Sequence, residues 1–388
     1  MIVGVLLLFG CIFGLAAIHP YVTYPVTLRL MRQTAPTAAG QVMAASRRSI
    51  AICMCAYNEE RVIVAKAESL LRMAAEYGSA TIHVFVDGAT DRTAELLEPY
   101  ADRIDVVVSQ VRSGKTAGMN ILVARSSADL IACTDANVRT TDDSLVRLAS
   151  ALSDPTIACA SARLVYENAR DSGSSAAGAA YWTLEEWVKS LESRTTSLIG
   201  VDGALFLIER TAYHATPPHL IDDLCVSLNV LLDGRRVVSC ADVLVSERSA
   251  VSWREEFRRK RRIACQGINV HRAMWPRLVR LPPMKLYGYI SHRLLKSLIP
   301  FNLAASAACF WALLAIFVGA PAAVALVVVS AVLLLLGALL GLRPMRLALG
   351  ALVALVGVGS GVLEALVLNR TYMVWTPAAS VREEARSA

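Results

Sequence analysis

Two oxygen-bearing residues, Asp135 and Asn137, have the clearest chemical potential in this sequence, because they follow a short apolar run at 130–133. Such a run suits a strand that is covered on both faces, as in a parallel sheet. Side chains alternate along an extended chain, so both residues are expected to project to the same side. Two oxygen ligands at the carboxyl end of a parallel strand can hold a hard cation against a diphosphate. A strand followed by a simple Asx turn is the structural alternative.

Repeated strand, polar turn and helix surround this stretch and predict an α/β sheet of the doubly wound kind. We expect strands at 49–55, 81–86, 105–109 and 130–133, with helices at 61–77, 93–100, 114–128 and 143–152. Ligands bind at the carboxyl ends of strands in such sheets. Those ends carry Tyr57, Glu59, Asp87, Lys115 and Asp135. Each has a structural alternative as a turn or capping residue, but together they predict a nucleotide pocket.

The second half of the predicted domain is less regular. We expect a strand at 157–165, a mobile loop at 171–178 and a helix at 181–193, followed by a segment at 199–208 that includes a small-residue turn. Gly203 and Ala204 form a small-residue turn that lets a ligand approach the backbone. Asp222 and Asp223 open a helix, where acids also complement the helix dipole. The basic block at 258–262 suits either a solvated face or a diphosphate clamp.

Membrane-spanning segments are predicted at both ends of the chain. The 388 residues are 55% hydrophobic with a mean hydropathy of +0.49, and the apolar excess lies at 2–18, 298–318, 321–342 and 346–368. Runs of about 20 apolar residues cross a bilayer. A retained helix fits the first run better than a cleaved signal peptide, since no basic region precedes it. The basic residues that follow it predict a cytoplasmic middle domain: Arg29, Arg32, Arg47 and Arg48.

The last apolar run is the least regular, because it contains Gly357, Gly359 and Gly361, followed by Glu364. Simple alternation of spans would place the arginine-containing tail outside, against the positive-inside tendency. A broken or re-entrant segment would remove this conflict. The predicted organisation is an N-terminal transmembrane helix (1–24), a basic linker (25–48), a catalytic domain (49–283), an amphipathic interfacial helix (284–296), a C-terminal transmembrane region (297–369) and a tail (370–388).

Cysteine usage and charge indicate the compartment and the partners. The nine cysteines include no CxxC pair and are expected to be reduced, buried residues of a cytoplasmic protein. The net charge is +7. Because the positive residues cluster beside the apolar runs and at 258–262, they favour anionic membrane lipid and an anionic small molecule, and not nucleic acid.

Seven motifs in order give the chain a resemblance to the membrane-bound family 2 inverting glycosyltransferases, the group of cellulose, chitin and hyaluronan synthases. The resemblance runs from Ile50 to about Gly267. The motifs lie at 56–60, 86–93, 114–120, 134–137, 203–204, 222–223 and 258–262. It implies a GT-A (Rossmann-like) cytoplasmic domain, a nucleotide-sugar donor, commonly a UDP-sugar, and Mg or Mn as the divalent cation.

The resemblance also implies roles for individual residues. Tyr57, Glu59 and Asp87 would hold the nucleoside, with Lys115 near it. Asp135 and Asn137 fall on the DxD motif that binds the metal and diphosphate. Asp223 falls on the general base, which takes the acceptor hydroxyl proton. By the same resemblance, Gly203, Ala204 and Asp222 would mark the acceptor region. Arg259 and Arg262 fall near the Gln-x-x-Arg-Trp motif.

The chain also departs from the family pattern. The second DxD acid is Asn137, a neutral side chain with one ligand oxygen, and the tryptophan of Gln-x-x-Arg-Trp is absent. These departures favour addition of one or a few sugars over long-chain synthesis. We therefore expect a multi-pass enzyme of the cell (inner or plasma) membrane that transfers a sugar to a hydroxyl of a glycan or lipid-linked acceptor. A polyprenyl-phosphate glycosyltransferase and a non-catalytic, nucleotide-sugar-binding partner of a synthase are the alternatives.

Overall fold

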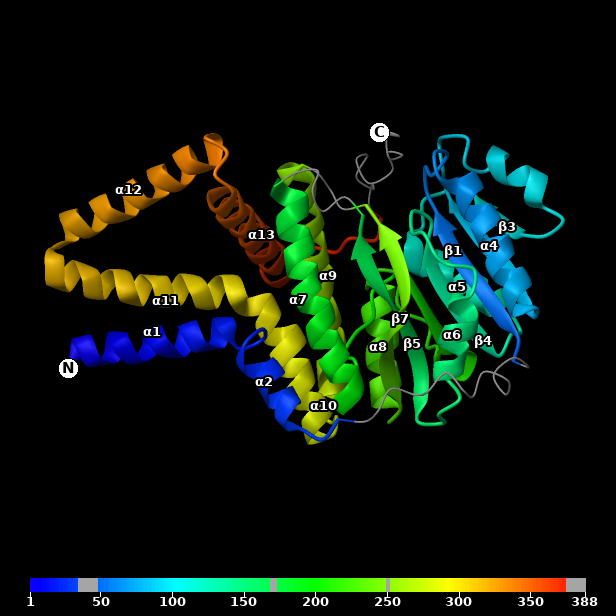
Figure 1. Ribbon diagram of the computed structural model, residues 1–388, viewed down its shortest axis with the longest axis horizontal. Helices are drawn as coiled ribbons and strands as arrows, with labels where there is room; N and C mark the ends of the chain where they lie inside the picture. The colour runs from blue at the N-terminus through cyan, green and yellow to red at the C-terminus, as the bar shows by residue number, and fades with distance from the viewer. Residues whose placement is uncertain (34–47, 168–172, 249–251, 375–388) are drawn as a thin grey trace.

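A seven-stranded mixed sheet forms the centre of the protein (Figure 1). The computed structural model describes residues 1–33, 48–167, 173–248 and 252–374. The sheet order is β3-β2-β1-β4-β6-β5-β7. All neighbours pair in parallel except β6, which runs antiparallel to both β4 and β5. The strands are β1 (Ile50–Ala56), β2 (Ala80–Asp87), β3 (Asp105–Ser109), β4 (Leu130–Asp135), β5 (Ile157–Tyr166), β6 (Leu205–Glu209) and β7 (Arg236–Glu247).

Helices cover both faces of this sheet. Alternate residues of β1 point to opposite sides, so Ile50 and Ile52 pack in one core and Ala51 and Cys53 in the other. The first core lies under α4 (Ile63–Tyr77) and α6 (Ser144–Ala151). The second lies under α5 (Lys115–Arg125), α8 (Asp222–Leu232) and α9 (Trp253–Leu278). All nine cysteines are free, as expected.

Four local expectations are corrected. β7 was not predicted at all, although it closes one edge of the sheet. The antiparallel β6 makes the sheet mixed, where a doubly wound parallel sheet was expected. Residues Glu95–Tyr100 form a 3-10 helix with Pro99 inside it, not an α-helix. The loop expected at 171–178 belongs from residue 173 onward to α7 (Gly173–Thr195), and residues 168–172 lie outside the described part.

The N-terminal segment is tied to both the apolar helices and the domain. α1 (Ile2–Ile18) lies along α11 (Leu295–Val318), where Ser306 Oγ donates to the Gly10 carbonyl at 2.8 Å. α2 (Thr23–Leu30) follows at a bend of 61°. Its Tyr24 and Leu28 are buried against α7. The expected basic linker 25–48 is therefore helical and packed at its start, and residues 34–47 lie outside the described part.

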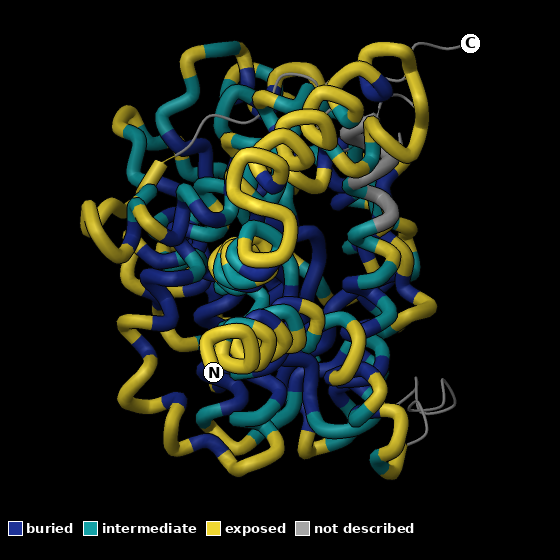
Figure 2. Tube along the Cα trace, turned by 90° about the vertical axis from the view of Figure 1, so that its left-hand side faces the viewer, coloured by how far each residue is buried: buried dark blue, intermediate teal, exposed yellow. Residues whose placement is uncertain are grey.

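Three C-terminal helices are long and apolar enough to cross a membrane, and the bent pair of α1 and α2 is a fourth candidate. α11 and α12 (Ala320–Leu339) project away from the sheet (Figure 1) and are exposed over most of their surface (Figure 2). Segment 284–296 forms α10 (Pro283–Gly288), a π-helical turn (Tyr289–Leu294) and the start of α11. Tyr289 and His292 in it are buried in protein, so this segment is not a simple surface helix.

The last helix, α13 (Arg343–Leu366), differs from the other apolar helices because it packs along α9. Its glycines allow the approach. A Cβ on Gly350 would lie 2.3 Å from the Trp253 ring, and one on Gly357 would lie 3.1 Å from the Phe257 carbonyl oxygen. After α13 the chain returns to the catalytic domain, where Asn269 donates to the Arg370 carbonyl at 2.8 Å. The residues that follow α13 therefore lie against this domain.

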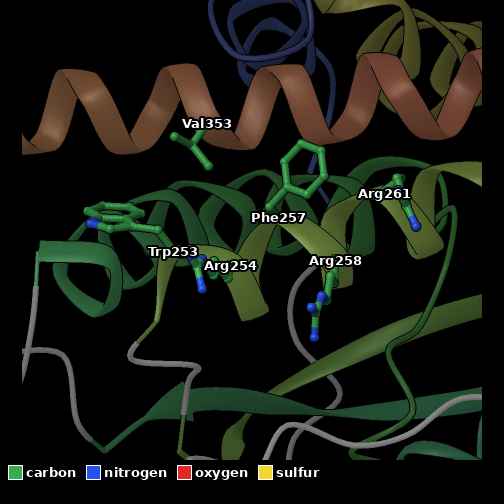
Figure 3. A pocket seen from close by; sticks show the side chains of 6 residues that line it. All are labelled: Trp253, Arg254, Phe257, Arg258, Arg261 and Val353. Atoms are coloured by element: carbon green, nitrogen blue, oxygen red, sulfur yellow. The ribbon is translucent and has the colours of Figure 1, made fainter.

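A cationic groove lies between α9 and α13 (Figure 3). It has a volume of about 560 Å³ and is lined by Trp253, Arg254, Phe257, Arg258, Arg261 and Val353. Arg254 and Arg258 are exposed and form no ion pair with any residue that the structure describes.

Candidate active site

The start of α5, the end of β4 and the start of α8 bring three predicted residues together. Lys115 Nζ donates to Asp135 Oδ1 at 2.6 Å and lies 3.9 Å from Asp222 Oδ2. Gly203 completes the cluster. A Cβ at this position would lie 2.6 Å from Lys115 Nζ, 3.4 Å from Asp135 Oδ2 and 3.7 Å from Asp223 Oδ2. The predicted base, the predicted DxD acid and the lysine that was predicted to lie near the nucleoside therefore share one small site.

Electrostatics in this cluster suit acid–base chemistry near neutral pH. Burial and the neighbouring carboxylate of Asp222 raise the pKa of Asp223 to about 7. Burial by itself would lower the pKa of Lys115, but Asp135, Asp222 and Asp223 outweigh it and raise that pKa well above its usual value. Lys115 is therefore a permanent cation, whereas Asp223 exchanges its proton in the physiological range.

A buried lysine shapes the turn that carries the DxD-like residues. Lys66 of α4 donates to Thr134 Oγ1 at 3.1 Å and to the Val138 carbonyl at 2.8 Å. Thr134 Oγ1 in turn donates to the Ala204 carbonyl at 2.8 Å, which joins the end of β4 to the Gly203–Ala204 turn. Burial lowers the pKa of Lys66 to about 7. Lys66 was not predicted as a site residue, because a lysine inside an amphipathic helix has no sequence motif that sets it apart from a surface lysine.

Asn137 takes a different partner from Asp135. Its amide nitrogen donates to Glu247 Oε2 at 3.4 Å, at the end of β7. Asp135 and Asn137 therefore have separate partners, Lys115 for Asp135 and Glu247 for Asn137. Their joint binding of a cation stays a prediction. Glu247 was not predicted, since β7 itself was not recognised in the sequence.

The basic block contributes two arginines to the same region from α9. Arg259 Nη2 donates to Tyr166 Oη at 3.0 Å and lies 4.0 Å from Glu247 Oε1. Arg262 is close enough to Asp223 and Asp135 to feel their charges, although burial and Arg259 lower its pKa to about 10. The other arginines of the block, Arg258 and Arg261, line the groove against α13. α9 therefore presents Arg259 and Arg262 to the candidate site on one face and Arg258 and Arg261 to the groove on another.

The predicted nucleoside residues form a second group. Asp87 accepts hydrogen bonds from the Ser113 amide at 2.6 Å and the Gly114 amide at 3.0 Å, and Arg112 Nε lies 3.3 Å away. Asp87 therefore fixes the loop before Lys115. Tyr57 stacks under Arg112, whose guanidinium carbon lies 3.3 Å from the ring centroid. Glu59 is buried, and its backbone amide donates to Thr93 Oγ1 at 2.8 Å.

Helix α8 is positioned by α5. Thr116 Oγ1 donates to the Leu220 carbonyl at 2.9 Å, two residues before Asp222. Asn120 Nδ2 donates to the Thr216 carbonyl at 2.7 Å. Asn120 belonged to a predicted motif, and its structural role is to hold this loop. The same helix therefore presents Lys115 at its start and orients the acids of α8 through its side.

The segment after α13 lies over the start of α5 and was not predicted to approach the site. Gln266 Nε2 donates to the Tyr372 carbonyl at 2.9 Å. Met373 contacts Gly114, whose φ of +92° a residue with a side chain would rarely adopt. Residues 370–374 therefore cover the loop between Asp87 and Lys115. No local sequence signal places the end of the chain here, because the contact depends on the path of α13.

The donor atoms in this region suit a hard divalent cation only in part. Asp135 offers one carboxylate and Asn137 one amide oxygen, both oxygen ligands of the kind that Mg²⁺ and Mn²⁺ prefer. Among the described residues no group of three or more His, Cys, Asp or Glu side chains converges on a metal position. A cation would therefore be held jointly by Asp135, Asn137 and the oxygens of a diphosphate.

Comparisons with known proteins agree with this fold. A mannosyltransferase from Pyrobaculum calidifontis, solved in complex with GDP-Man and Mn²⁺, superposes with a TM-score of 0.71 at 19% identity and covers 92% of this chain and 99% of its own. Beta-monoglucosyldiacylglycerol synthase from Nostoc sp. (strain PCC 7120) is 23% identical over 157 residues, 39% of this chain and 33% of that protein. This match spans about a third of the relative's length.

Residues 51–214 match the family described as Glycosyl transferase family 2. This match and the relative above indicate a glycosyltransferase. The matched residues lie on a GT-A-like mixed α/β sheet.

Proposed function

We propose that this protein is a membrane-anchored inverting glycosyltransferase that moves a sugar from a nucleotide-sugar to a hydroxyl of a glycan or lipid-linked acceptor. The carrying observation is the convergence of Asp223, Lys115 and Asp135 around Gly203. Only a glycine leaves room there for a ligand to approach all three side chains. A UDP-sugar is the proposed donor, and GDP-mannose is the first competitor to test, because the similar mannosyltransferase holds GDP-Man.

In the proposed reaction Asp223 accepts the proton of the acceptor hydroxyl as its oxygen attacks the anomeric carbon. The attack comes from the face opposite the leaving diphosphate, which inverts the anomeric configuration. Lys115, Arg259 and Arg262 stabilise the negative charge that develops on the diphosphate. A divalent cation, when bound by Asp135 and Asn137, adds further charge stabilisation.

Membrane anchoring is supported by the exposed apolar helices α11 and α12 and by the groove beside α13. With the catalytic domain in the cytoplasm, α11 leads out and α12 leads back. α13 then lies along α9 at the membrane surface. The lipid partner proposed for the groove is an anionic phospholipid, since two exposed arginines there have no described acidic partner.

The test is donor turnover by the full-length protein in detergent with Mn²⁺ or Mg²⁺, across UDP-, GDP- and dTDP-sugars. We expect release of one nucleoside diphosphate, and loss of at least about 100-fold in the Asp223→Asn variant, the range for a general base. Asp233→Asn, directly after the end of the same helix, is the matched control, because Asp233 pairs with His214 at 2.7 Å, away from the cluster. Turnover that survives Asp223→Asn would instead indicate a polyprenyl-phosphate acceptor, which needs little base catalysis.

A further inference from the structure

We propose that Glu247 supplies the carboxylate that the Asp-Ala-Asn motif lacks, so that Asp135 and Glu247 together face the cation and the donor diphosphate. This inference rests on the proposed function and extends it to a residue outside the family motif. Its starting point is the contact between Asn137 Nδ2 and Glu247 Oε2 at 3.4 Å. Glu247 is therefore an acid beside Asn137, the motif position at which a neutral amide replaces the carboxylate of the family pattern.

Main-chain hydrogen bonds fix the place of Glu247. The Arg139 amide donates to the Ser246 carbonyl at 2.8 Å, and the Ser246 amide donates back to the Arg139 carbonyl at 3.0 Å. The Glu167 amide donates to the Glu247 carbonyl at 3.0 Å. The end of β7 is thus tied directly to the chain two residues after Asn137. Glu247 is held there by the backbone, and its nearness to Asn137 does not depend on a flexible surface side chain.

A purely structural ion pair with Arg259 explains Glu247 less well. The distance from Arg259 Nη2 to Glu247 Oε1 is 4.0 Å, at the limit of an ion pair. Arg259 has closer partners in Tyr166 Oη at 3.0 Å and Glu256 Oε2 at 3.8 Å. The carboxylate of Glu247 has about four lone-pair positions. Within the described part of the chain its carboxylate contacts this arginine and accepts the long hydrogen bond from Asn137, so it retains capacity for a further ligand.

Charge at the cation-binding end leads to the same conclusion. Lys115 already forms an ion pair with Asp135 at 2.6 Å, which offsets part of the negative charge of that carboxylate. With Asn137 neutral, the motif by itself offers one carboxylate for a dication that binds beside a diphosphate. Hard cations bind more tightly as the number of anionic oxygen ligands rises. Glu247 restores the second negative charge from β7, while the Asn137 amide oxygen remains available because its nitrogen faces Glu247.

The test moves the carboxylate from position 247 to position 137. Mn²⁺ affinity of the full-length protein with saturating nucleoside diphosphate is measured from the electron paramagnetic resonance signal of free Mn²⁺. We expect Glu247→Gln to weaken Mn²⁺ binding by about tenfold or more. The double variant Asn137→Asp with Glu247→Gln should recover most of that loss, because the charge returns to the motif. Glu167→Gln is the control, since Glu167 accepts from Ser246 Oγ at 2.6 Å on the same edge.

A second arm covers the case in which Glu247→Gln does not fold. Asn137→Asp alone places a carboxylate near Glu247, so its Tm should fall without metal and rise on addition of Mn²⁺ by more than in the unmodified protein. Unchanged Mn²⁺ affinity in Glu247→Gln, or a Tm loss in Asn137→Asp that Mn²⁺ does not reverse, overturns the proposal. These readouts do not need turnover. An inactive protein whose Mn²⁺ affinity follows the charge swap would contradict the proposed function and leave the role of Glu247 standing.

Discussion

Lys115 Nζ lies 2.6 Å from Asp135 Oδ1, and this contact joins the start of α5 to the end of β4. It places one permanent cation among the carboxylates of Asp135, Asp222 and Asp223. α5 begins after β3, and β4 ends beside it, at the carboxyl ends of parallel strands where α/β proteins bind their ligands. The contact therefore lies where we propose that the donor phosphate and the acceptor hydroxyl meet.

Replacing Lys115 by methionine should reduce donor turnover by about 100-fold or more, the range for loss of one stabilising donor. Its removal also leaves Asp135 without its close partner, so the KM for the donor should rise. Steady-state kinetics of nucleoside diphosphate release measure both effects. Lys285→Met serves as the control, since Lys285 bonds only the Gly234 and Arg235 carbonyls at the far end of α8 among the described residues. Equal losses in both variants would count against a phosphate-binding role for Lys115.

Activity should depend on pH through Asp223, whose pKa is raised to about 7. The base works only when it is ionised, so kcat/KM should fall as the pH drops below about 7 and level off above it. Asp222→Asn removes the neighbouring negative charge that helps to raise this pKa. Its acid limb should therefore move to lower pH. A pH–rate profile of both proteins measures the shift, and an unmoved limb would assign the titration to another group.

Gly203→Ala should impair the reaction while leaving the fold intact. The added Cβ would lie 2.6 Å from Lys115 Nζ, the end of a flexible side chain, so the lysine rather than the backbone would move. Misplacement of this kind should reduce turnover by about tenfold to 100-fold. Thermal unfolding and donor kinetics separate the two effects. Gly267→Ala is the matched control, because a Cβ there meets nothing within 4 Å.

The C-terminus should lie on the same side of the membrane as the catalytic domain. Asn269 and Gln266 of α9 bond the carbonyls of Arg370 and Tyr372, which ties the end of α13 to that domain. Reporter fusions measure this topology. A reporter active only in the cytoplasm should work after residue 388, and one active only outside should work when inserted at Gly319, between α11 and α12. The opposite pattern at the C-terminus would mean that α13 crosses the membrane.

Loss of the exposed groove arginines should reduce the response to anionic lipid. Arg254→Ala with Arg258→Ala removes two cations from the surface beside α13, each worth about 1 kcal/mol near an anionic membrane. Turnover in nanodiscs of rising anionic lipid content should then respond only at higher lipid charge. Arg72→Ala with Arg103→Ala removes the same charge elsewhere, from two exposed ion pairs. An identical response in both double variants would argue against a lipid site at the groove.

Local sequence determined much of this protein. Apolar runs bounded by polar turns predicted β1 to β4 and the helices α4 and α5 between them, because short-range periodicity follows directly from strand and helix geometry. The α-helix predicted between β2 and β3 is a 3-10 helix. The predicted residues Lys115, Asp135, Asp222, Asp223 and Gly203 do converge, since the ends of consecutive parallel strands meet at one sheet edge. Their roles stay predictions until the variants are measured.

Tertiary structure decided the parts that depend on long-range pairing. β7 forms beside β5 and brings Glu247 to Asn137, a contact over 110 residues that no local pattern encodes. Lys66 became a support for the β4 turn because α4 packs across it. α13 looks like a membrane span by composition, yet its glycines fit α9 and return residues 370–374 to the site. Hydropathy records how apolar a helix is, whereas packing alone determines which surface covers it.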